Sequence, residues 1–395
     1  MTLSATYLTL LVQVFVLAII SSEGRIVSNV KPHLGETFYG EIRELLRRRL
    51  DDIENEAPIF DEELPPRPEE NLAWRGPQNL GQISAVSVDP NGRPVIFHRG
   101  HHTWGYSTFN SSFHYQDVTQ GPIIQDTVLT LDPVTGDIID SWGKSLFYMP
   151  HGLHIDVFGN VWLTDVALHQ VFKFRRNAKN PSLILGERFQ PGSDSIHFCQ
   201  PTTVVVAPAG EIIVADGYCN NRIMVFNAAG GLLEVIPQPG EFLSLQVPHS
   251  LALLPELDIV CIADRENMRV TCPNVGLKQS RTRSPPLTIQ QPDLGRVFAV
   301  AAYGNYVYAV NGPTSPMIPV RGFTLDPRTE RVIDHWSPLS DKFTQPHDVA
   351  VCPNGTAIYV TEIGPNRVWK FDLIRASSKN FTFSPESIIT TTGIP

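Results

Sequence analysis

Residues 153–174 read LHIDVFGNVWLTDVALHQVFKF, and this stretch decides the fold because its pattern recurs along the chain. It contains an alternating apolar strand, a Gly/Asn turn, a second strand ending in Asp165, a polar loop and a third strand. The same pattern reads VVVAPAGEIIVADGYCNNRIMVF at 204–226, LALLPELDIVCIADRENMRVTC at 251–272 and VAVCPNGTAIYVTEIGPNRVWKF at 349–371. Self-similarity of this kind predicts a repeat architecture.

The prolines that open these units set the period of the repeat. Pro150, Pro201, Pro248 and Pro346 are 51, 47 and 98 residues apart, and 98 is two periods of 49. Weaker copies, AVSVDPNGRPVIFHRG at 85–100 and VFAVAAYGNYVYAVNG at 297–312, complete a set of six. Six short-stranded units predict an all-β, six-bladed β-propeller, because each small sheet can bury its faces only against its neighbours. The spacing leaves room for a fourth, outer strand in each blade, and residues 126–142 supply one such edge.

The first 24 residues are predicted to be a secretory signal peptide. The apolar run YLTLLVQVFVLAII at 7–20 is short for a membrane span and typical of a signal-peptide core. No charged side chain precedes this run, so an uncleaved membrane anchor is the alternative. We therefore expect a secreted or secretory-vesicle protein without a membrane span after signal cleavage.

The remaining chain divides by composition. Residues 25–80 contain a charged stretch that predicts one amphipathic helix, ETFYGEIRELLRRRLDDIENE, and a Pro/Glu-rich linker. The propeller is expected at 81–375, with a tail at 376–395. Three sequons, at Asn110, Asn354 and Asn380, are expected glycosylation sites in the secretory pathway.

Charge and cysteine content exclude or favour certain classes. The formal net charge of −9 argues against a nucleic-acid partner, because phosphate binding needs clustered positive charge. Five cysteines in an oxidising compartment suggest two disulfides and one left over. Cys261 and Cys272 flank a short turn and could face each other across a hairpin. Cys199 and Cys219 would then be the other pair, with Cys352 free.

Three histidines follow the opening proline of alternate units. MPHGLHI, VPHSLAL and QPHDVAV place His151, His249 and His347 at equal intervals of 98 residues. The innermost strand of a propeller blade starts beside the central channel, so these positions lie about 120° apart around the axis. Three imidazoles around one point, with a fourth position open, form the arrangement of a catalytic zinc. Simple capping of backbone groups is the alternative, but Thr202 at the equivalent position shows that the repeat does not require histidine.

Other polar side chains are expected at the same end of the channel. The second strand returns to this level 14 or 15 residues after the histidine position, at Asp165, Asp216, Asp264 and Glu362, which we expect to tie the turns of their blades. In the first unit the equivalent position is assigned to Arg99, and Tyr218 and Arg265 lie beside it in the third and fourth units. Arginine can hold a carboxylate, and a phenol whose pKa is lowered by nearby positive charge can act as a base. This set predicts Lewis-acid chemistry on a small substrate that carries a carboxylate and a hydroxyl.

Several long phrases resemble the peptidyl-α-hydroxyglycine α-amidating lyase family: HRGHHTW, LFYMPHGLHID, TDVALHQVFKF, QPGSDSIHFCQPT, DGYCNNRI, VPHSLALLP, ADRENMRV and QPHDVAV. The resemblance runs from about residue 80 to 372. It implies an NHL-type propeller that cleaves the C–N bond of peptides ending in α-hydroxyglycine, giving an amidated peptide and glyoxylate, as in neuropeptide maturation. It also implies coupling to a separate peptidylglycine-hydroxylating monooxygenase. Since 80 residues cannot hold that domain, a stand-alone lyase is expected.

The resemblance also assigns roles to residues. It implies Zn2+ at the three histidines and Tyr218 as the base that deprotonates the substrate hydroxyl. Arg99 and Arg265 would hold the substrate carboxylate and stabilise developing charge. A structural Ca2+ would be bound by Asp348 and by the backbone carbonyls of Val86 and Leu153, hard oxygen ligands that suit calcium.

The chain departs from the family pattern at three positions. His101 stands where the family has aspartate, Gln345 where it has methionine, and Glu362 where it has aspartate. None of these removes a named catalytic group. Two alternatives have other functions: a non-catalytic NHL-type propeller that serves as a binding module, and a calcium-dependent lactonase-type hydrolase. A docking face does not need three symmetric histidines, and a lactonase site would be rich in Asp, Asn and Glu.

Overall fold

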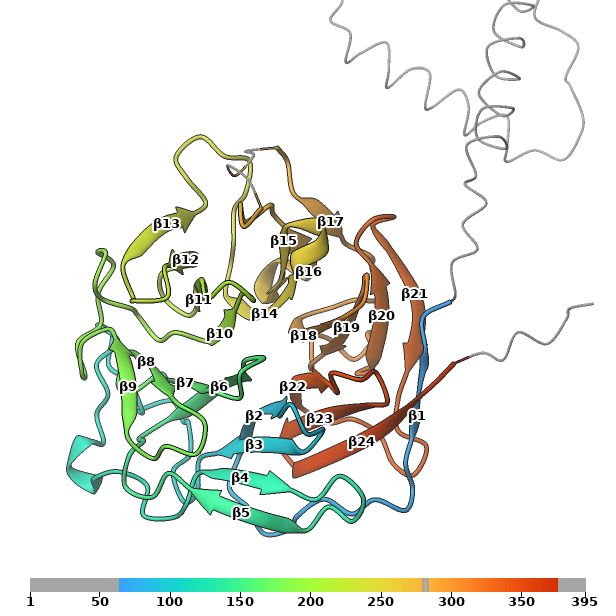
Figure 1. Ribbon diagram of the computed structural model, residues 1–395, viewed down its shortest axis with the longest axis horizontal. Helices are drawn as coiled ribbons and strands as arrows, with labels where there is room; N and C mark the ends of the chain where they lie inside the picture. Colours follow the sequence, from blue (N-terminus) through green and yellow to red (C-terminus); the bar gives the residue numbers. More distant parts are fainter. Residues whose placement is uncertain (1–63, 279–280, 282–283, 376–395) are drawn as a thin grey trace, which may run out of the picture. The chain divides into compact units, whose positions relative to one another are not determined.

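The computed structural model describes residues 64–278, 281 and 284–375. These residues form six antiparallel sheets of four strands each, arranged around a central channel (Figure 1). The prediction of a six-bladed β-propeller is therefore confirmed. The expected signal peptide, the expected helix before residue 64, the tail at 376–395 and the sequon at Asn380 lie outside the described residues.

The first three blades follow one another along the chain, each running from its innermost to its outermost strand. Blade one consists of β2 (Ile83–Val88), β3 (Pro94–His98), β4 (Val128–Leu131) and β5 (Ile138–Trp142). Blade two consists of β6 (Pro150–Ile155), β7 (Val161–Asp165), β8 (Gln170–Phe174) and β9 (Pro181–Leu185). Blade three consists of β10 (Thr203–Val206), β11 (Ile212–Asp216), β12 (Arg222–Phe226) and β13 (Leu232–Ile236).

The last three blades repeat this order, except that the sixth takes its outer strand from elsewhere. Blade four consists of β14 (Pro248–Leu254), β15 (Ile259–Asp264), β16 (Arg269–Cys272) and β17 (Leu287–Ile289). Blade five consists of β18 (Val297–Tyr303), β19 (Tyr306–Asn311), β20 (Gly322–Asp326) and β21 (Arg331–Trp336). Blade six consists of β22 (Pro346–Val351), β23 (Ala357–Ile363), β24 (Asn366–Ile374) and β1 (Arg67–Glu70).

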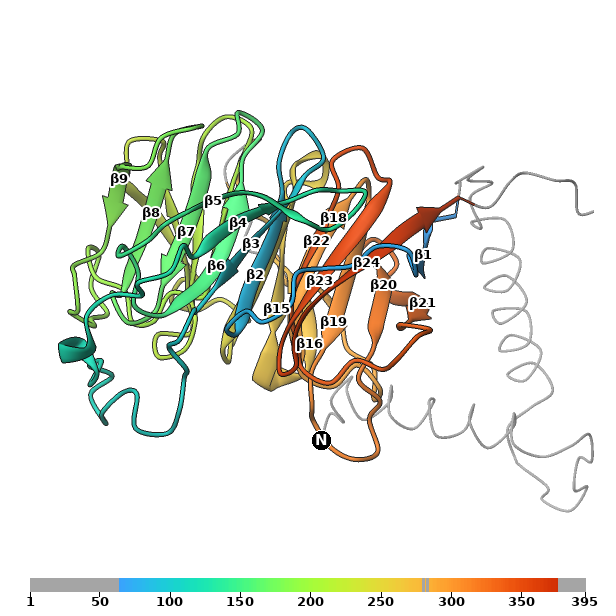
Figure 2. The ribbon, with the colours of Figure 1, turned by 90° about the horizontal axis from the view of Figure 1, so that it is seen from below.

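Strand β1 closes the ring. It pairs antiparallel with β24, the last strand of the chain, so that blade six is built from both ends of the described region (Figure 2). The expected domain boundary at residue 81 therefore moves to Leu64, where the compact unit begins. Composition could not show this, because RPEE has no apolar periodicity and gains its strand conformation only by pairing with β24.

The same tight turn joins the first two strands in blades one, two, three and six. In blade two the Gly159 N–H donates to the Asp156 carbonyl at 2.8 Å, and the Asp156 N–H donates to Asn160 at 3.0 Å. The glycine of each turn has a positive φ, 80°, 81°, 108° and 66° in chain order, which glycine adopts without steric cost. These turns are the Gly signals read from the repeat.

The core is divided among the interfaces between neighbouring blades. Six apolar clusters each combine side chains from two adjacent blades, including the pair of blades six and one. Both faces of each sheet are therefore buried, which is why a strand such as β11, IIVAD, is buried at every position. Helical structure in the described part of the chain is limited to three short 3-10 segments, Val118–Gln120, Pro255–Leu257 and Arg265–Asn267. None of the described helices has the length and hydropathy needed to span a membrane.

Candidate metal centre and its surroundings

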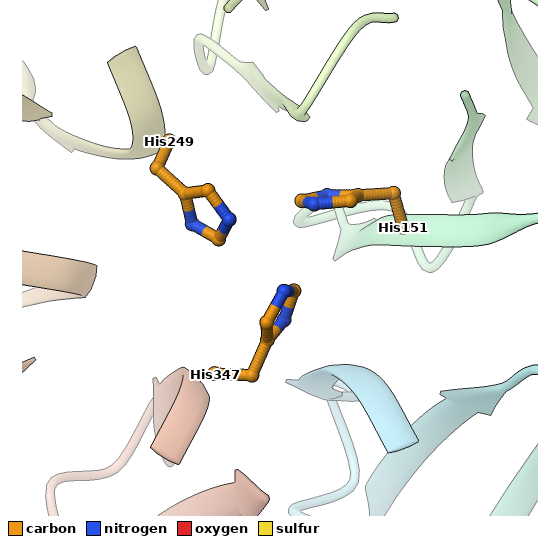
Figure 3. A group of neighbouring side chains, drawn as sticks. All are labelled: His151, His249 and His347. Atoms are coloured by element: carbon orange, nitrogen blue, oxygen red, sulfur yellow. The ribbon is translucent and has the colours of Figure 1, made fainter. Parts of the chain in front are cut away.

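The three histidines lie at one end of the channel, each as the second residue of an innermost strand. His151, His249 and His347 come from β6, β14 and β22, and their imidazoles point toward a common centre (Figure 3). One nitrogen from each ring lies within 4.8 Å of the others. Pairing with the second strand is irregular at each of these positions, and such a bulge turns a side chain out of the normal alternation toward the axis.

Backbone carbonyls of the odd blades fix the protonation of these histidines. Nδ1 of His151 lies 2.7 Å from the Thr202 carbonyl, Nδ1 of His249 2.6 Å from that of Phe298, and Nδ1 of His347 2.6 Å from that of Ser84. A carbonyl can only accept, so each Nδ1 carries the proton and each Nε2 presents a lone pair. Ser84, Thr202 and Phe298 occupy the histidine position of blades one, three and five. The repeat thus alternates ligand and carbonyl around the ring.

This donor set fits a divalent cation. Burial lowers the pKa of all three histidines, that of His347 to about 3, so all three rings are neutral near pH 7. Three buried lone pairs facing one another are unfavourable unless a cation sits between them. Neutral imidazoles with carbonyl-bound Nδ1–H groups are the usual zinc ligands, and the three-histidine set leaves a fourth position for substrate.

Tyr218 lies directly against this centre. Its hydroxyl is 2.9 Å from Nε2 of His151 and 3.1 Å from Nε2 of His249. Burial raises the pKa of the Tyr218 phenol, and the positive charges of Arg265 and Arg99 act in the opposite direction. The expected lowering of this pKa is thus not produced by the protein side chains alone, because desolvation outweighs the two guanidinium groups.

Arg99 is fully buried, with 2% of its surface exposed. Its Nε donates to the Pro150 carbonyl at 2.9 Å and its Nη1 donates to Oε1 of Gln82 at 2.8 Å. Its Nη2 is buried and has no hydrogen-bond partner among the described residues. Burial lowers the pKa of Arg99 to about 10, which leaves it charged at neutral pH. A charged, unpartnered donor beside a metal centre is suited to a substrate oxygen.

Arg265 stands on the other side of Tyr218. Its guanidinium carbon lies 5.3 Å from the centre of the Tyr218 ring and 5.0 Å from that of Phe298, within cation–π range. Its Nε donates to Glu266 at 2.9 Å, and Glu266 also pairs with Arg296 at 3.0 Å. The structure therefore brings all six residues predicted for the site, three histidines, one tyrosine and two arginines, to one end of the channel.

One sequence alignment of the repeats was wrong by a single position. The register of blade one pairs Ile83 with His98, just as Pro150 pairs with Asp165. His98, not Arg99, is the equivalent of the acids, and Arg99 corresponds to Arg265, which follows Asp264. The error arose because the bulge in β2 changes the number of residues between the two strands, and counting along the chain cannot detect it.

The four acids have the structural role expected of them. Asp165 accepts backbone N–H groups of Tyr148 and Met149 at 2.7 and 2.9 Å, tying its turn to the loop before β6. Asp216 and Asp264 pair with Arg222 and Arg269 of their own blades. Glu362 does the same work with a longer side chain, accepting from Thr344 and Gln345 N–H at 2.6 and 2.8 Å and from the indole of Trp369 at 2.7 Å.

The residues predicted to bind calcium lie further along the channel. Asp348 shares a small void of about 10 Å³ with the three histidines, and on its other side lies a cavity of about 310 Å³ lined also by Val86 and Leu153. Asp348 accepts the Val86 N–H at 2.9 Å, and desolvation raises its pKa to about 7. A carboxylate in this environment is ionised more readily when a cation is present.

Two departures from the family pattern lie at exposed positions. His101 is exposed and its Nδ1 lies 2.8 Å from Oε1 of Gln125, so the extra imidazole is held by a surface amide. Gln345 is also exposed and contributes its backbone N–H to Glu362. Neither forms a hydrogen bond with the metal centre in the part of the chain described.

The disulfide prediction is confirmed. Cys199 is bonded to Cys219 and Cys261 to Cys272, and Cys352 is free and buried. The first bridge holds the loop that carries Tyr218 to the segment before β10. Asn110 and Asn354 are both exposed, as glycosylation would require.

Sequence reasoning missed three residues around the site. Gln82 holds Arg99, as described above. Trp104 packs its ring 4.9 Å from that of Tyr218 and 5.5 Å from the Arg99 guanidinium, and Phe298 lies 5.2 Å from the ring of His249. Phe298 could have been found, because it occupies the histidine position of blade five in the repeat. Gln82 and Trp104 carry no repeat signal.

Comparison with known proteins identifies relatives over most of the chain. An NHL repeat model matches residues 198–226, within blade three. Peptidyl-alpha-hydroxyglycine alpha-amidating lyase 2 of Drosophila melanogaster is 50% identical over 373 residues, covering 86% of this chain and 91% of that protein. Peptidylglycine alpha-amidating monooxygenase of Rattus norvegicus is 44% identical over 319 residues, covering 77% of this chain but 32% of that longer protein.

Solved structures add evidence on the fold. A gluconolactonase of Xanthomonas campestris matches with a TM-score of 0.53 at 11% identity, over 79% of this chain and 97% of that one. Identity this low supports a common propeller architecture and nothing about chemistry. The sequence relatives are far more similar and extend across the blades that hold the histidines, Tyr218 and the arginines. The chain therefore belongs to the peptidyl-α-hydroxyglycine α-amidating lyase family.

Proposed function

We propose that this protein is a zinc-dependent lyase that cleaves peptidyl-α-hydroxyglycine into a C-terminally amidated peptide and glyoxylate. The observation that carries the proposal is the convergence of three histidine Nε2 atoms with the Tyr218 hydroxyl at one end of the channel. The names of the sequence relatives support the same reaction.

The substrate carries a hydroxyl and a carboxylate on one carbon, and the site offers a partner for each. A zinc ion bound by His151, His249 and His347 would supply Lewis acidity at the substrate hydroxyl and a positive charge that favours the Tyr218 phenolate. Arg99 offers its unpartnered Nη2 to the carboxylate, and Arg265 adds a second positive charge on the opposite side of Tyr218.

The reaction moves one proton from the hydroxyl oxygen to the amide nitrogen. Tyr218 accepts the hydroxyl proton, the C–N bond breaks with its electron pair going to nitrogen, and the nitrogen takes up a proton to become the primary amide. One phenol positioned between hydroxyl and nitrogen serves both transfers. The arginines keep the carboxylate in place, so that the departing product is glyoxylate.

Calcium, location and supply of substrate complete the proposal. Calcium would be held by Asp348 and the carbonyls of Val86 and Leu153, as a structural ion. Two disulfides and two exposed sequons support passage through the secretory pathway. Substrate would come from a peptidylglycine-hydroxylating monooxygenase, which the name of the rat relative supports.

A lactonase-type hydrolase is the competing function, since a gluconolactonase shares the fold. It is disfavoured by the ligand set, which at the histidine end is three neutral imidazoles rather than carboxylates and amides. A non-catalytic binding module is disfavoured by Arg99, whose buried unpaired charge has no use in docking a protein on the outer surface.

The proposal is tested by following glyoxylate release from a short peptide ending in α-hydroxyglycine. We expect release well above the spontaneous rate, lost on chelation and restored by zinc. Tyr218→Phe should lower kcat by about 10²–10⁴ while zinc content, measured by elemental analysis, stays near one per chain. Active protein that contains no zinc, or a Tyr218→Phe variant with full activity, would overturn the mechanism.

A further inference from the structure

Arg99 differs from other well-buried arginines of this protein in having no counter-ion. Three others lie next to a carboxylate: Arg222 is 2.9 Å from Asp216, Arg269 is 2.7 Å from Asp264 and Arg281 is 2.6 Å from Glu241. Within the described residues, Arg99 forms no ion pair although it is only 2% exposed. Burying an unpaired charge is unfavourable, so its retention points to a use for that charge.

Neutral acceptors hold the Arg99 guanidinium. The Pro150 carbonyl accepts from Nε and the Gln82 side-chain oxygen accepts from Nη1, at 2.9 and 2.8 Å. Gln82 also holds the backbone, because its carbonyl accepts the Arg99 N–H at 2.9 Å. Two of the three guanidinium nitrogens are therefore fixed without any neutralising charge, and Nη2 is left buried without a partner among the described residues.

We propose that Gln82 is a positioning residue for the lyase reaction, which fixes Arg99 with Nη2 free for the substrate carboxylate and leaves its charge uncompensated. This inference rests on the function proposed above. Gln82 extends its influence to Trp104, whose N–H lies 3.4 Å from the same side-chain oxygen and whose ring packs on Tyr218. One amide thus orients the carboxylate clamp and the aromatic wall behind the base.

The choice of glutamine over glutamate separates a functional role from a structural one. A glutamate here would accept from the same donors and would add an ion pair with Arg99, so folding alone would tolerate or favour it. A carboxylate next to Nη1 would, however, compete electrostatically with the carboxylate of the substrate. Only a requirement for uncompensated positive charge disfavours glutamate.

The experiment compares Gln82→Glu with Gln78→Glu, a matched control that makes the same charge change at an exposed position whose side chain bonds only to the Gly76 carbonyl. Kinetics are measured with a peptide ending in α-hydroxyglycine and with its neutral C-terminal amide. Glyoxylate binding is measured by calorimetry, and zinc content and Tm are recorded for each variant.

We expect Gln82→Glu to fold with a Tm at least equal to wild type and full zinc content, yet to raise KM for the carboxylate peptide about tenfold or more. Glyoxylate affinity should fall by a similar factor, the neutral amide should show no such loss, and Gln78→Glu should match wild type. Gln82→Met, which removes the acceptor without adding charge, should lower kcat because the guanidinium is no longer held.

Wild-type KM and glyoxylate affinity in a folded, zinc-loaded Gln82→Glu protein would overturn the inference while leaving the lyase function intact. An equal loss with the neutral amide would also overturn it, because the effect would not depend on the substrate charge. Failure of the wild-type protein to release or bind glyoxylate would instead overturn the proposed function, and this inference with it.

Discussion

The chemistry at the histidine end depends on which nitrogen of each imidazole carries the proton. The partners that decide this are backbone carbonyls, and side-chain substitution cannot remove them. Thr164 supports one of them, because its hydroxyl donates to the Thr202 carbonyl at 3.0 Å and accepts the Gly152 N–H at 2.7 Å. The imidazole of His151 is therefore held by two layers of hydrogen bonds.

At the same scale, Asp348 predicts a pH-dependent response to calcium. Its pKa is raised from 3.8 to about 7 in the folded protein, so without a cation the folded state keeps a proton that the unfolded state loses. The contribution of this group to the free energy of unfolding therefore falls as pH rises from about 4 to 7. Calcium should reverse that loss, and the increase in Tm on adding calcium should be larger at pH 8 than at pH 5.5.

The control for this prediction is Asp348→Asn, which removes the ionisable group and keeps its size. Its Tm should respond little to calcium at either pH in scanning calorimetry. A wild-type protein that gains nothing from calcium at pH 8, or an Asp348→Asn variant with the full response, would contradict the assignment of calcium to this residue.

At the scale of elements, the loop between β11 and β12 determines where the base lies. Tyr218 is in this loop, and the Cys199–Cys219 disulfide ties its neighbour to the segment before β10. The Cys261–Cys272 disulfide instead joins β15 and β16 within one sheet. The two bridges close chain segments of 20 and 11 residues and thus constrain the unfolded chain to a similar degree.

Removing each bridge should therefore separate stability from activity. Replacing either cysteine pair by serine should reduce the free energy of unfolding by about 2–4 kcal/mol. The Cys199/Cys219 variant should also lose about tenfold or more in kcat, because Tyr218 is no longer held against the histidines. The Cys261/Cys272 variant serves as the control and should keep its kcat at temperatures where it is folded. Equal kcat values for the two variants would show that the first bridge does not position the base.

For the whole molecule, stability comes from a closed ring of equivalent interfaces. The cluster between blades six and one unites residues from the two ends of the described region, such as Ile96 and Tyr359. β1 adds the outer edge of blade six, and the Tyr308 hydroxyl donates to the Pro66 carbonyl at 2.8 Å. Opening the ring at this point exposes the whole edge of β24.

Truncation from the N-terminus should reveal this closure. A chain beginning at Leu64 should fold and keep the Tm of the full propeller, whereas one beginning at Leu72 lacks β1 and should melt about 5–10 °C lower. The exposed β24 edge should also make the shorter chain prone to aggregation, visible by light scattering. Equal Tm values for the two truncated chains would show that β1 is dispensable for closure.

The sequence by itself determined the propeller and the three histidines, because both follow from the period of the repeat. A period of about 49 residues is a local property that each unit expresses through its own strands and turns. The doubled period then places every second unit's histidine at one level of the axis. Tyr218, Arg265 and the two disulfides followed from short spacings within or between adjacent units.

Only the tertiary structure decided the register of Arg99, the role of Gln82 and the strand β1. The bulge in β2 shifts the pairing by one residue, and no spacing in the chain reveals it. The contacts of Ser84 with His347 and of Val86 with Asp348 span 263 and 262 residues, and they exist because the last blade returns beside the first. Closure of the ring joins residues that share no local pattern, and for this reason the second set of interactions cannot be derived from the repeat.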